Sequence, residues 1–250
     1  MMLRFPYSIK SLSRAALPLL AGASLLAGCR HDTVTPNPAA DYYPLTVGTY
    51  RTYAVSDTTW SKGVATGSSY QLREAVTEQY LDAAGQPAYR VLRARRASAS
   101  AAWVDDSVLV VQPLSQAVTL TRDNVRTIEL IYPLVAKKTW RKYSFTTTRD
   151  DSVRAFDPTV GQALTTPGAA PKTYDNTAVA RDVEPVSVND GLYRRAGYLQ
   201  GFALGVGPVM RRRYYYETFT IGAGQVQLLT PGVIQVGRSR LEVLVDSGKL

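Results

Sequence analysis

The stretch YQLREAVTEQYLDAAGQPAYRVLRARR, residues 70–96, decides the fold class of this chain. On a strand, one face of its first half would carry Leu72, Glu74, Val76, Glu78 and Tyr80. Residues 73–75 could equally open a helix, and periodicity alone permits both structures. Gly85 and Pro87 fall at the tip of a hairpin, whereas a helix would place them near an end. We therefore predict a β-hairpin over this stretch.

Strand-forming and turn-forming residues continue through most of the remaining chain. The 16 tyrosines, with many valines and threonines between short turn clusters, favour an antiparallel sheet. The predicted strands are residues 50–55, 107–112, 117–121, 126–131, 140–147, 182–188, 209–219, 225–229 and 238–246. Residues 157–176, rich in Gly, Pro, Ala and Thr, are predicted to form one long loop. The expected fold is mainly β: a single domain of antiparallel strands in a curved sheet or an open or half barrel.

Two segments of the sequence echo each other. YPLTVGTYRTYAV begins at Tyr43, and YPLVAKKTWRKYSF begins at Tyr132. Each is typical of a proline-containing turn that leads into an aromatic strand, so the echo predicts two halves of one β structure. Tyr50 and Trp140 hold matching places, and the tyrosine three residues after each falls on the opposite strand face. One aromatic residue of each pair should be buried, and Tyr50 and Trp140 are the candidates.

The N-terminal residues are typical of an export signal. Arg4, Lys10 and Arg14 supply positive charge, and residues 15–28 form an apolar run that ends in small side chains. That run is too short for the ~30 Å hydrocarbon core of a membrane, which takes about 20 apolar residues. Removing residues 1–28 lowers the formal charge from +9 to +6, because they hold three basic residues and no acidic one. A basic exported chain is expected to meet anionic lipid headgroups or acidic polysaccharide and no nucleic acid.

The four residues LAGC, 26–29, resemble the lipobox of bacterial lipoproteins. In that family the cysteine thiol is linked to a diacylglycerol, the chain is cut just before it, and the new amino end is acylated. The resemblance implies that Cys29, the only cysteine, is a membrane anchor. Arg30 stands where an aspartate retains such proteins at the inner membrane of enterobacteria, which implies an outer-membrane destination in either leaflet. The alternative is an ordinary secretory signal with a chance cysteine.

Residues 29–41 are expected to hold the lipidated cysteine and a short flexible tether, followed by the β-rich domain at 42–250. Prolines, threonines and small residues indicate an extended linker. The linker contains His31, the only histidine of the chain. We interpret it as a solvated residue rather than a general base or a metal ligand.

Further blocks carry a wider resemblance: DYYPLTVGTYRTYAV from residue 41, the stretch 70–96, AAWVDDSVLVVQ, RTIELIYPLVAKKTWRKYSF and GFALGVGPVMRRRYYYE. They are similar to a family of uncharacterised lipoproteins of Gram-negative bacteria. Its members begin the mature domain with Tyr-Pro-Leu-x-x-Gly-x-x-Trp-x-Tyr and carry Gly-Val-Gly-x-Val near the end. Here Tyr50 replaces the first tryptophan, and Lys137-Lys138 replace a second glycine. The resemblance implies localisation and fold, and it implies no activity.

The sequence predicts no enzyme, no cofactor and no metal site. The domain has no histidine or cysteine, which excludes Ser-His-Asp and Cys-His catalysis and a Cys/His zinc site. It also has no Gly-x-Ser-x-Gly elbow, P-loop or Rossmann fingerprint. Asp105-Asp106 and Asp150-Asp151 are adjacent carboxylates, which point to opposite faces of a strand and so do not face each other as in a glycosidase. Residues 205–208, GVGP, are predicted to form a tight turn.

The stretch VMRRRYYYE, residues 209–217, is the remaining candidate site. On a strand, Arg211, Arg213 and Tyr215 share one face, while Tyr214 and Tyr216 lie on the other. Arginines beside aromatic rings can bind anions and stack on sugars. The alternative is a purely structural strand with packed tyrosines and solvated arginines.

Three functions remain open from the sequence. The first is a lipid-anchored, non-catalytic binding module whose concave face takes a lipid, glycan or peptide. The second is an accessory subunit that docks on another envelope protein through exposed tyrosines. A carboxylate-based hydrolase is the third and would need two carboxyl groups roughly 5–9 Å apart in a cleft.

Overall fold

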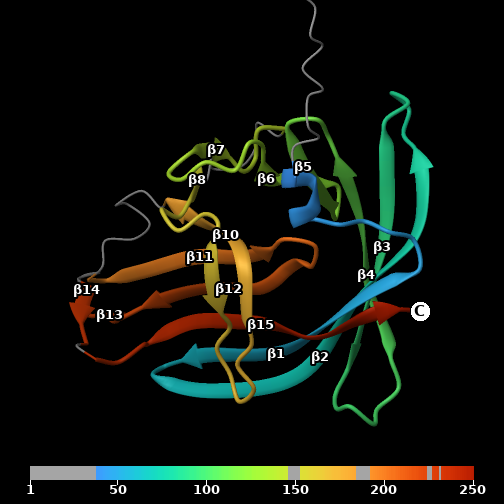
Figure 1. Cartoon of the computed structure of the whole chain (residues 1–250). Helices are drawn as coiled ribbons and strands as arrows, with labels where there is room; N and C mark the ends of the chain where they lie inside the picture. Colours follow the sequence, from blue (N-terminus) through green and yellow to red (C-terminus); the bar gives the residue numbers. More distant parts are fainter. Residues whose placement is uncertain (1–37, 146–152, 184–191, 224–226, 231) are drawn as a thin grey trace, which may run out of the picture. The chain divides into compact units, whose positions relative to one another are not determined.

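The chain folds into antiparallel strands, and the hairpin predicted over residues 70–96 is confirmed (Figure 1). The computed structural model describes residues 38–145, 153–183, 192–223, 227–230 and 232–250. The described part forms one compact unit, Pro38–Leu250, which begins with the short 3-10 helix η2 (Pro38–Tyr42). The predicted signal, Cys29, Arg30 and His31 lie outside the described residues. In the described ranges, no helix is long and apolar enough to cross a membrane.

The first half of the domain is a meander of six strands in which each strand pairs with the next. These strands are β1 (Thr49–Ser61), β2 (Val64–Leu81), β3 (Pro87–Arg96), β4 (Val104–Pro113), β5 (Ala117–Arg122) and β6 (Val125–Ile131). The turn between β2 and β3 is stabilised by Asp82, whose carboxylate accepts hydrogen bonds from the backbone N–H groups of Ala84 and Gln86. Gly85, at φ 72°, takes the left-handed conformation that this turn requires.

The second half contributes the other strands. These are β7 (Thr139–Arg141), β8 (Val153–Phe156), β9 (Gln162–Thr165), β10 (Thr173–Val183), β11 (Arg194–Ala203), β12 (Gly207–Glu217), β13 (Phe219–Ile221), β14 (Gln227–Leu229) and β15 (Val236–Lys249). β13 and β14 form a small separate sheet. A turn in front of β12 is confirmed, but it lies at residues 204–206, because β12 already begins at Gly207; Gly205 and Gly207 are both at positive φ.

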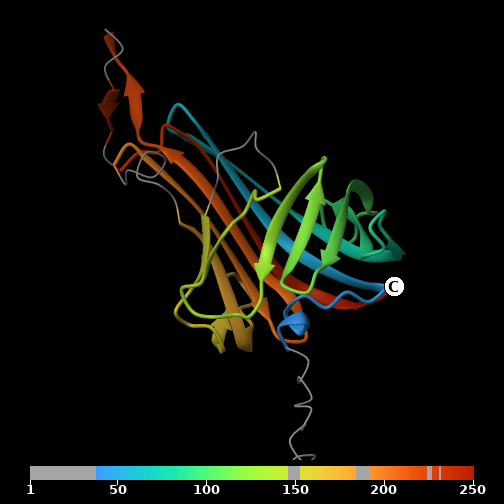
Figure 2. The same cartoon turned by 90° about the horizontal axis from the view of Figure 1, so that it is seen from above.

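One continuous sheet runs in the order β6-β5-β4-β3-β2-β1-β15-β12-β11-β10-β8-β7, with β9 beside β10. The echoed segments lead into β1 and β7, the first strands of the two halves, and the last strand, β15, joins the halves by pairing with both β1 and β12. The sheet bends around an interior (Figures 1 and 2). Its two edges approach each other, because the backbone N–H of Ile128 in β6 donates to the carbonyl oxygen of Lys142 just after β7. The expected curved sheet of antiparallel strands is confirmed, and the structure shows it to be nearly closed.

The prediction of a single long loop at residues 157–176 is wrong. This segment contains β9 and the start of β10, which pair with each other. The Thr177 hydroxyl also donates to the carbonyl oxygen of Gln162 at 2.7 Å. The segment is rich in Gly, Pro and Ala, but its threonines suffice for a short strand when a neighbouring strand satisfies their backbone groups. β8, β11 and most of β10 were not predicted. The strand predicted at 140–147 is too long, because β7 ends at Arg141 and residues 142–145 form a turn. Residues 146–147, 184–188 and 225–226 of the predicted strands lie outside the described residues.

Apolar side chains fill one part of the interior. Val76, Leu109, Leu130, Phe156 and Phe202, from five different strands, pack in one buried cluster. η2 closes this cluster, since the rings of Tyr42 and Tyr43 belong to it. A second cluster surrounds the fully buried Tyr53. The core is therefore the inside of the bent sheet.

The two aromatic residues at matching places in the echo have different environments. Trp140 is buried at 7% exposure against Phe156, with ring centroids 4.8 Å apart. Tyr50 is only partly buried, and its hydroxyl donates to Asp246. In the first copy, the fully buried residue is Tyr53. The prediction of burial holds for Trp140 and is wrong for Tyr50, because alternation along β1 turns the face of Tyr53, and not that of Tyr50, to the interior.

Candidate functional site

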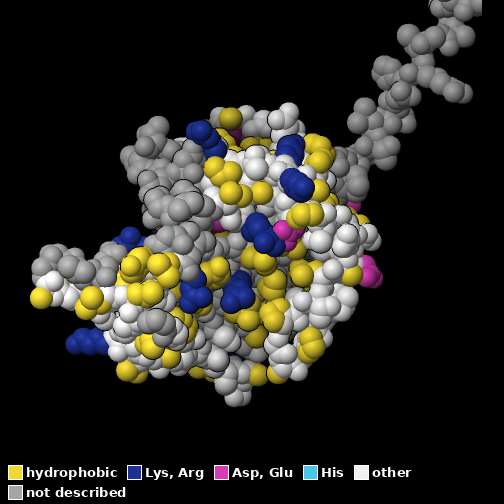
Figure 3. Space-filling model, turned by 90° about the vertical axis from the view of Figure 1, so that its left-hand side faces the viewer, with side chains coloured by type: hydrophobic (Ala, Val, Ile, Leu, Met, Phe, Trp, Pro, Cys, Tyr) yellow, Lys and Arg dark blue, Asp and Glu magenta, His cyan; other side chains and the backbone are white. Residues whose placement is uncertain are grey.

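A cavity of about 630 Å³ opens on the inner side of the sheet, next to the apolar core. Most of the charged side chains that line it are basic. The basic residues are Arg93, Arg122, Lys142, Arg154, Arg211, Arg213, Arg238 and Arg240, and the acidic ones are Glu74, Asp123, Glu129 and Glu242. Viewed from the side where β13 and β14 lie in Figure 1, the surface shows several Lys and Arg side chains and few Asp or Glu (Figure 3). The cavity is thus a basic one.

The alternation of strand residues brings these charges inside. Along β12, the inward positions pass from Val209 in the core to Arg211 and then Arg213. Along β15 they pass from Leu244 to Glu242 and Arg240. The register places Arg211 opposite Glu242 and Arg213 opposite Arg240. Each strand therefore contributes its apolar end to the core and its charged end to the cavity.

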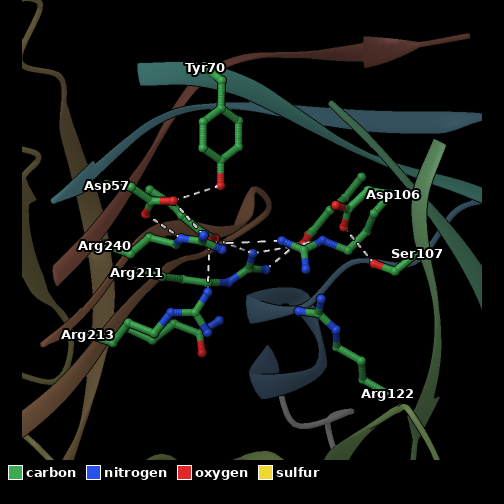
Figure 4. A network of polar contacts seen from close by, with 12 residues as sticks. Asp57, Tyr70, Asp106, Ser107, Arg122, Arg211, Arg213 and Arg240 are labelled. Carbon is green, nitrogen blue, oxygen red and sulfur yellow. Dashed lines mark hydrogen bonds and ion pairs between the residues drawn. The ribbon is translucent and has the colours of Figure 1, made fainter. Parts of the chain in front are cut away.

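The deepest charges form an ion-pair network around Arg211 (Figure 4). Its two terminal nitrogens donate to the two carboxylate oxygens of Glu74 at 2.8 and 3.0 Å, a bidentate pair. The same guanidinium donates to Glu242 at 3.1 Å. Arg93 adds longer ion pairs to both carboxylates, at 3.5 and 3.9 Å. Glu74, Glu242 and Arg93 are all at most 5% exposed, so a break in this network would leave a charge in a dry environment.

The electrostatics of Glu74 follow from this surrounding. Burial alone would raise the pKa of its carboxyl group. The charge and hydrogen bonds of Arg211, together with the charges of Arg93 and Arg51, outweigh burial and lower the pKa to about 2. Glu74 is therefore a fixed negative charge at neutral pH.

A second buried network surrounds Arg154 on β8. Its side chain is 1% exposed and makes ion pairs of 3.1 Å with both Glu129 and Asp182. Its guanidinium also lies over the ring of Tyr198, at 4.3 Å from the centroid. Burial lowers the pKa of Arg154, but Glu129, Tyr198 and Asp182 oppose burial and raise the pKa overall. Lys142 supplies a second positive charge beside Glu129, so the two carboxylates are balanced, and the network holds β6, β8 and β10 together.

Gln200 connects the two networks. When its amide is oriented to suit its neighbours, the nitrogen donates to Glu129 at 3.2 Å and the oxygen accepts from Nε of Arg211 at 3.2 Å. Gln200 is 1% exposed. The polar layer thus runs continuously across the inside of the sheet, from β2 to β6.

Four arginines lie toward the opening of the cavity: Arg122, Arg213, Arg238 and Arg240. A second cavity of about 610 Å³ is lined by these same four side chains and by Asp57, so the two hollows adjoin. Arg240 binds both carboxylate oxygens of Asp57, which also accepts a hydrogen bond from Tyr70 (Figure 4). Such a rim can attract and hold anions.

The structure places the predicted strand faces of residues 209–217 correctly. Arg211, Arg213 and Tyr215 line the hollows, as members of one face. Tyr214 also borders the second hollow, but its ring stacks on Tyr216, at 5.1 Å between centroids, on the other side of the sheet. The five candidates are therefore divided between two faces. Arg211 and Arg213 line the basic cavity, and Tyr215 lies beside Arg213 in the second hollow.

An aromatic row lies on the outer face. Trp60 on β1 meets Tyr216 edge to face with centroids 5.2 Å apart, and Tyr216 stacks on Tyr214. Gly197 lies beneath Tyr214 so closely that a Cβ there would come within 2.8 Å of the ring. The absence of a side chain at Gly197 leaves the space that the Tyr214 ring occupies on the sheet.

Most of the cavity residues were not predicted. Glu74, Arg93, Arg154, Arg240 and Glu242 were not singled out, because a buried strand face is expected to be apolar. The available signal was the alternation of charged and uncharged residues in RSRLEV, residues 238–243, together with the charged run RRR, residues 211–213. These two stretches indicate a charged inner layer only if their strands are neighbours in the sheet. Their separation in the sequence does not show that the strands pair.

Of the two adjacent carboxylate pairs, the structure describes only Asp105-Asp106. Asp105 and Asp106 are both exposed on β4, and Asp150-Asp151 lie outside the described residues. Glu74 and Glu242 do share one guanidinium inside the cavity. A general acid needs a raised pKa, however, and that of Glu74 is lowered. Among the described residues, no group of three His, Cys, Asp or Glu side chains is arranged to hold a metal ion.

The chemistry of the site is that of anion binding: a half-open hollow with guanidinium groups at its rim, fixed by two ion-pair networks at its base. Compared with known proteins, the chain matches no family model and no curated protein sequence.

Proposed function

We propose that this protein is a non-catalytic binding module of the bacterial cell envelope, anchored through Cys29, that takes an anionic group of a glycan, lipid or peptide into its basic cavity. The observation that carries this proposal is the excess of eight basic over four acidic side chains around one hollow of about 630 Å³. The polar lining favours a charged group over an acyl chain, since an acyl chain would leave guanidinium groups without water or a partner.

The anchor part of the proposal rests on the lipobox resemblance of residues 26–29 and places the protein in the outer membrane. Cys29→Ser is expected to abolish incorporation of radioactive palmitate and to leave an unprocessed or released protein. Two or more acyl chains make attachment effectively permanent, and their loss removes it. His31→Ala, two residues away, should label as the unchanged protein does. Equal labelling of the Cys29→Ser variant would disprove the anchor.

The binding part can be tested by calorimetry on the full-length protein in a neutral detergent. A heparin hexasaccharide should bind and neutral maltohexaose should not. Binding should weaken as salt is added, because the rim is solvent-accessible. Arg213→Gln removes a charge from the cavity and should weaken heparin binding about tenfold, the effect of losing one charged hydrogen bond.

Arg212→Gln is the matched control, since Arg212 is the next residue of β12 and lies on the outer face. It changes the net charge equally and should leave heparin affinity unchanged. Equal loss in both variants would mean that net charge alone attracts the ligand, and the cavity would then have no special role. Absence of binding by heparin and by every other anionic ligand tested in the next subsection would refute the function.

Docking on another envelope protein is the second candidate function. The outer aromatic row of Trp60, Tyr216 and Tyr214 supports it, because such rings are frequent at protein interfaces. The heparin titration also tests whether this row takes part in anion binding. Tyr216→Ala should leave heparin binding intact if the cavity is the binding site.

A further inference from the structure

The surplus positive charge of the cavity is concentrated at one end. Around Arg154, the two cations Arg154 and Lys142 are matched by the carboxylates of Glu129 and Asp182. At the other end there are six arginines and only four carboxylates. The arginines are Arg93, Arg122, Arg211, Arg213, Arg238 and Arg240, and the carboxylates are Glu74, Glu242, Asp57 and Asp123. The formal excess at this end is two positive charges.

The ion-pair partners of the individual arginines show where the two excess positive charges lie. At the bottom of the cavity, Arg211 and Arg93 form ion pairs with Glu74 and Glu242. Arg240 forms an ion pair with Asp57. Arg238, on the rim, has no ion pair with any residue that the structure describes, and it lies opposite Tyr215 in the register. Arg213 has only a 3.6 Å ion pair with Glu242, a carboxylate that also serves two other arginines. The excess therefore lies at Arg213 and Arg238.

Arg122 approaches the same place from β5. Its one ion pair is with Asp123, at 3.5 Å, and Asp123 is 83% exposed, so that pair is weak. Its Nε is buried and has no hydrogen-bond partner among the described residues. Figure 4 shows the Arg122 side chain directed toward the network from the side opposite to Arg213.

Like charges also face each other here. Arg213 and Arg240 are directly opposite in the pairing of β12 with β15, an arrangement that is ordinarily destabilising. Burial lowers the pKa of Arg213, and the positive charges of Arg240 and Arg93 lower it further against the opposing effect of Glu242. An anion bound between these guanidinium groups would relieve the repulsion.

We infer that Arg213, Arg238 and Arg122 form a subsite for a doubly charged phosphate monoester group. Two unmatched positive charges match a dianion, and guanidinium groups donate paired hydrogen bonds that fit the oxygens of a phosphate. Three separate guanidinium groups can each meet one of its oxygens. This inference rests on the proposed anion-binding function and specifies the group that is bound.

The experiment compares glucose 6-phosphate with glucose 6-sulfate, which have the same shape but carry two negative charges and one. Calorimetry uses the full-length protein in neutral detergent. Near neutral pH, the phosphate should bind at least about tenfold more tightly than the sulfate, a difference of about 1.4 kcal/mol. Between about pH 7.5 and pH 5, the phosphate affinity should fall toward that of the sulfate, because the second pKa of a phosphate monoester is near 6.

Arg238→Gln is the decisive variant, because Arg238 is exposed and has no ion pair within the described part of the chain, and its removal spares the buried networks. It should remove most of the preference for phosphate over sulfate. Arg195→Gln, an equal charge change at an exposed residue that lies opposite Tyr216 in the outer aromatic row, should keep that preference. If sulfate binds as tightly as phosphate, or if Arg238→Gln keeps the preference, the subsite is wrong although the anion-binding function stands. If neither ester, heparin nor the vesicles below bind, both proposals fail.

Parallel binding experiments with three ligands distinguish the possible sources of the phosphate group. Inorganic phosphate tests the free ion, glucose 6-phosphate tests a phosphorylated sugar, and phosphatidylcholine vesicles with phosphatidic acid test a lipid headgroup. Vesicles with phosphatidylglycerol at equal total charge are the control for attraction by charge alone. Tighter binding that depends on Arg238 in any one arm supports the subsite and identifies the source, and its absence in all arms refutes it.

Discussion

Replacing Glu74 with alanine is expected to lower the free energy of unfolding by about 3–5 kcal/mol, the usual effect of removing one partner from a buried ion pair. The carboxylate of Glu74 binds Arg211 through two hydrogen bonds and also faces Arg93. Without it, two nearly buried guanidinium groups would share the single carboxylate of Glu242. Equilibrium unfolding in urea measures the difference.

Glu78→Ala on the same strand is the matched control. Glu78 pairs with Arg90 at 2.7 Å, a shorter distance than many in the cavity, but the two side chains are 46% and 52% exposed. Water screens such a pair, and its loss should change stability by no more than about 1 kcal/mol. Similar losses in both variants would show that the inner network does not stabilise the fold more than a surface pair.

The effect of Glu74→Ala should also depend on pH. Burial is the largest single effect and raises the pKa of Glu74. Arg211, Arg93 and Arg51 together outweigh burial and lower the folded-state pKa from 4.5 to about 2. Its stabilising effect is therefore complete above about pH 4.5 and is lost as the pH falls toward 2. The difference between the original protein and the variant should narrow across that range. A difference that stays constant with pH would mean that packing, and not charge, is the cause.

Trp140→Ala should destabilise the domain by about 3–5 kcal/mol, the range for truncation of a buried aromatic residue. The ring contacts Phe156, and its Nε1 donates to the carbonyl oxygen of Ile128 at 3.2 Å. It thereby links β7 to β6, the two edges that close the sheet. The loss is a large share of a stability that is ordinarily about 5–15 kcal/mol.

Tyr50→Ala is the control for Trp140, because Tyr50 holds the matching place in the echo but is only partly buried. Urea titration should show a cost for Tyr50→Ala well below that for Trp140→Ala. The outcome that contradicts the structure is a neutral Trp140→Ala, which would mean that β6 and β7 do not close over this ring.

The alternating pattern determined the local structure because a strand needs only neighbouring residues to define its two faces. The stretch 70–96 was predicted as a hairpin from its period and from Gly85, and β2 and β3 confirm it. The same reasoning assigned Arg211, Arg213 and Tyr215 to one face of β12, and these residues line the cavity hollows. For these features, the sequence was sufficient.

Tertiary structure alone decided that the charged face is the inner one. Arg211 meets Glu74 across 137 positions of sequence, and Arg240 meets Asp57 across 183. Both contacts depend on β15 lying between β1 and β12, a pairing that no local pattern specifies. A charge can be buried only where folding supplies its partner, so the sequence of a single strand cannot show whether its arginines face solvent or a cavity.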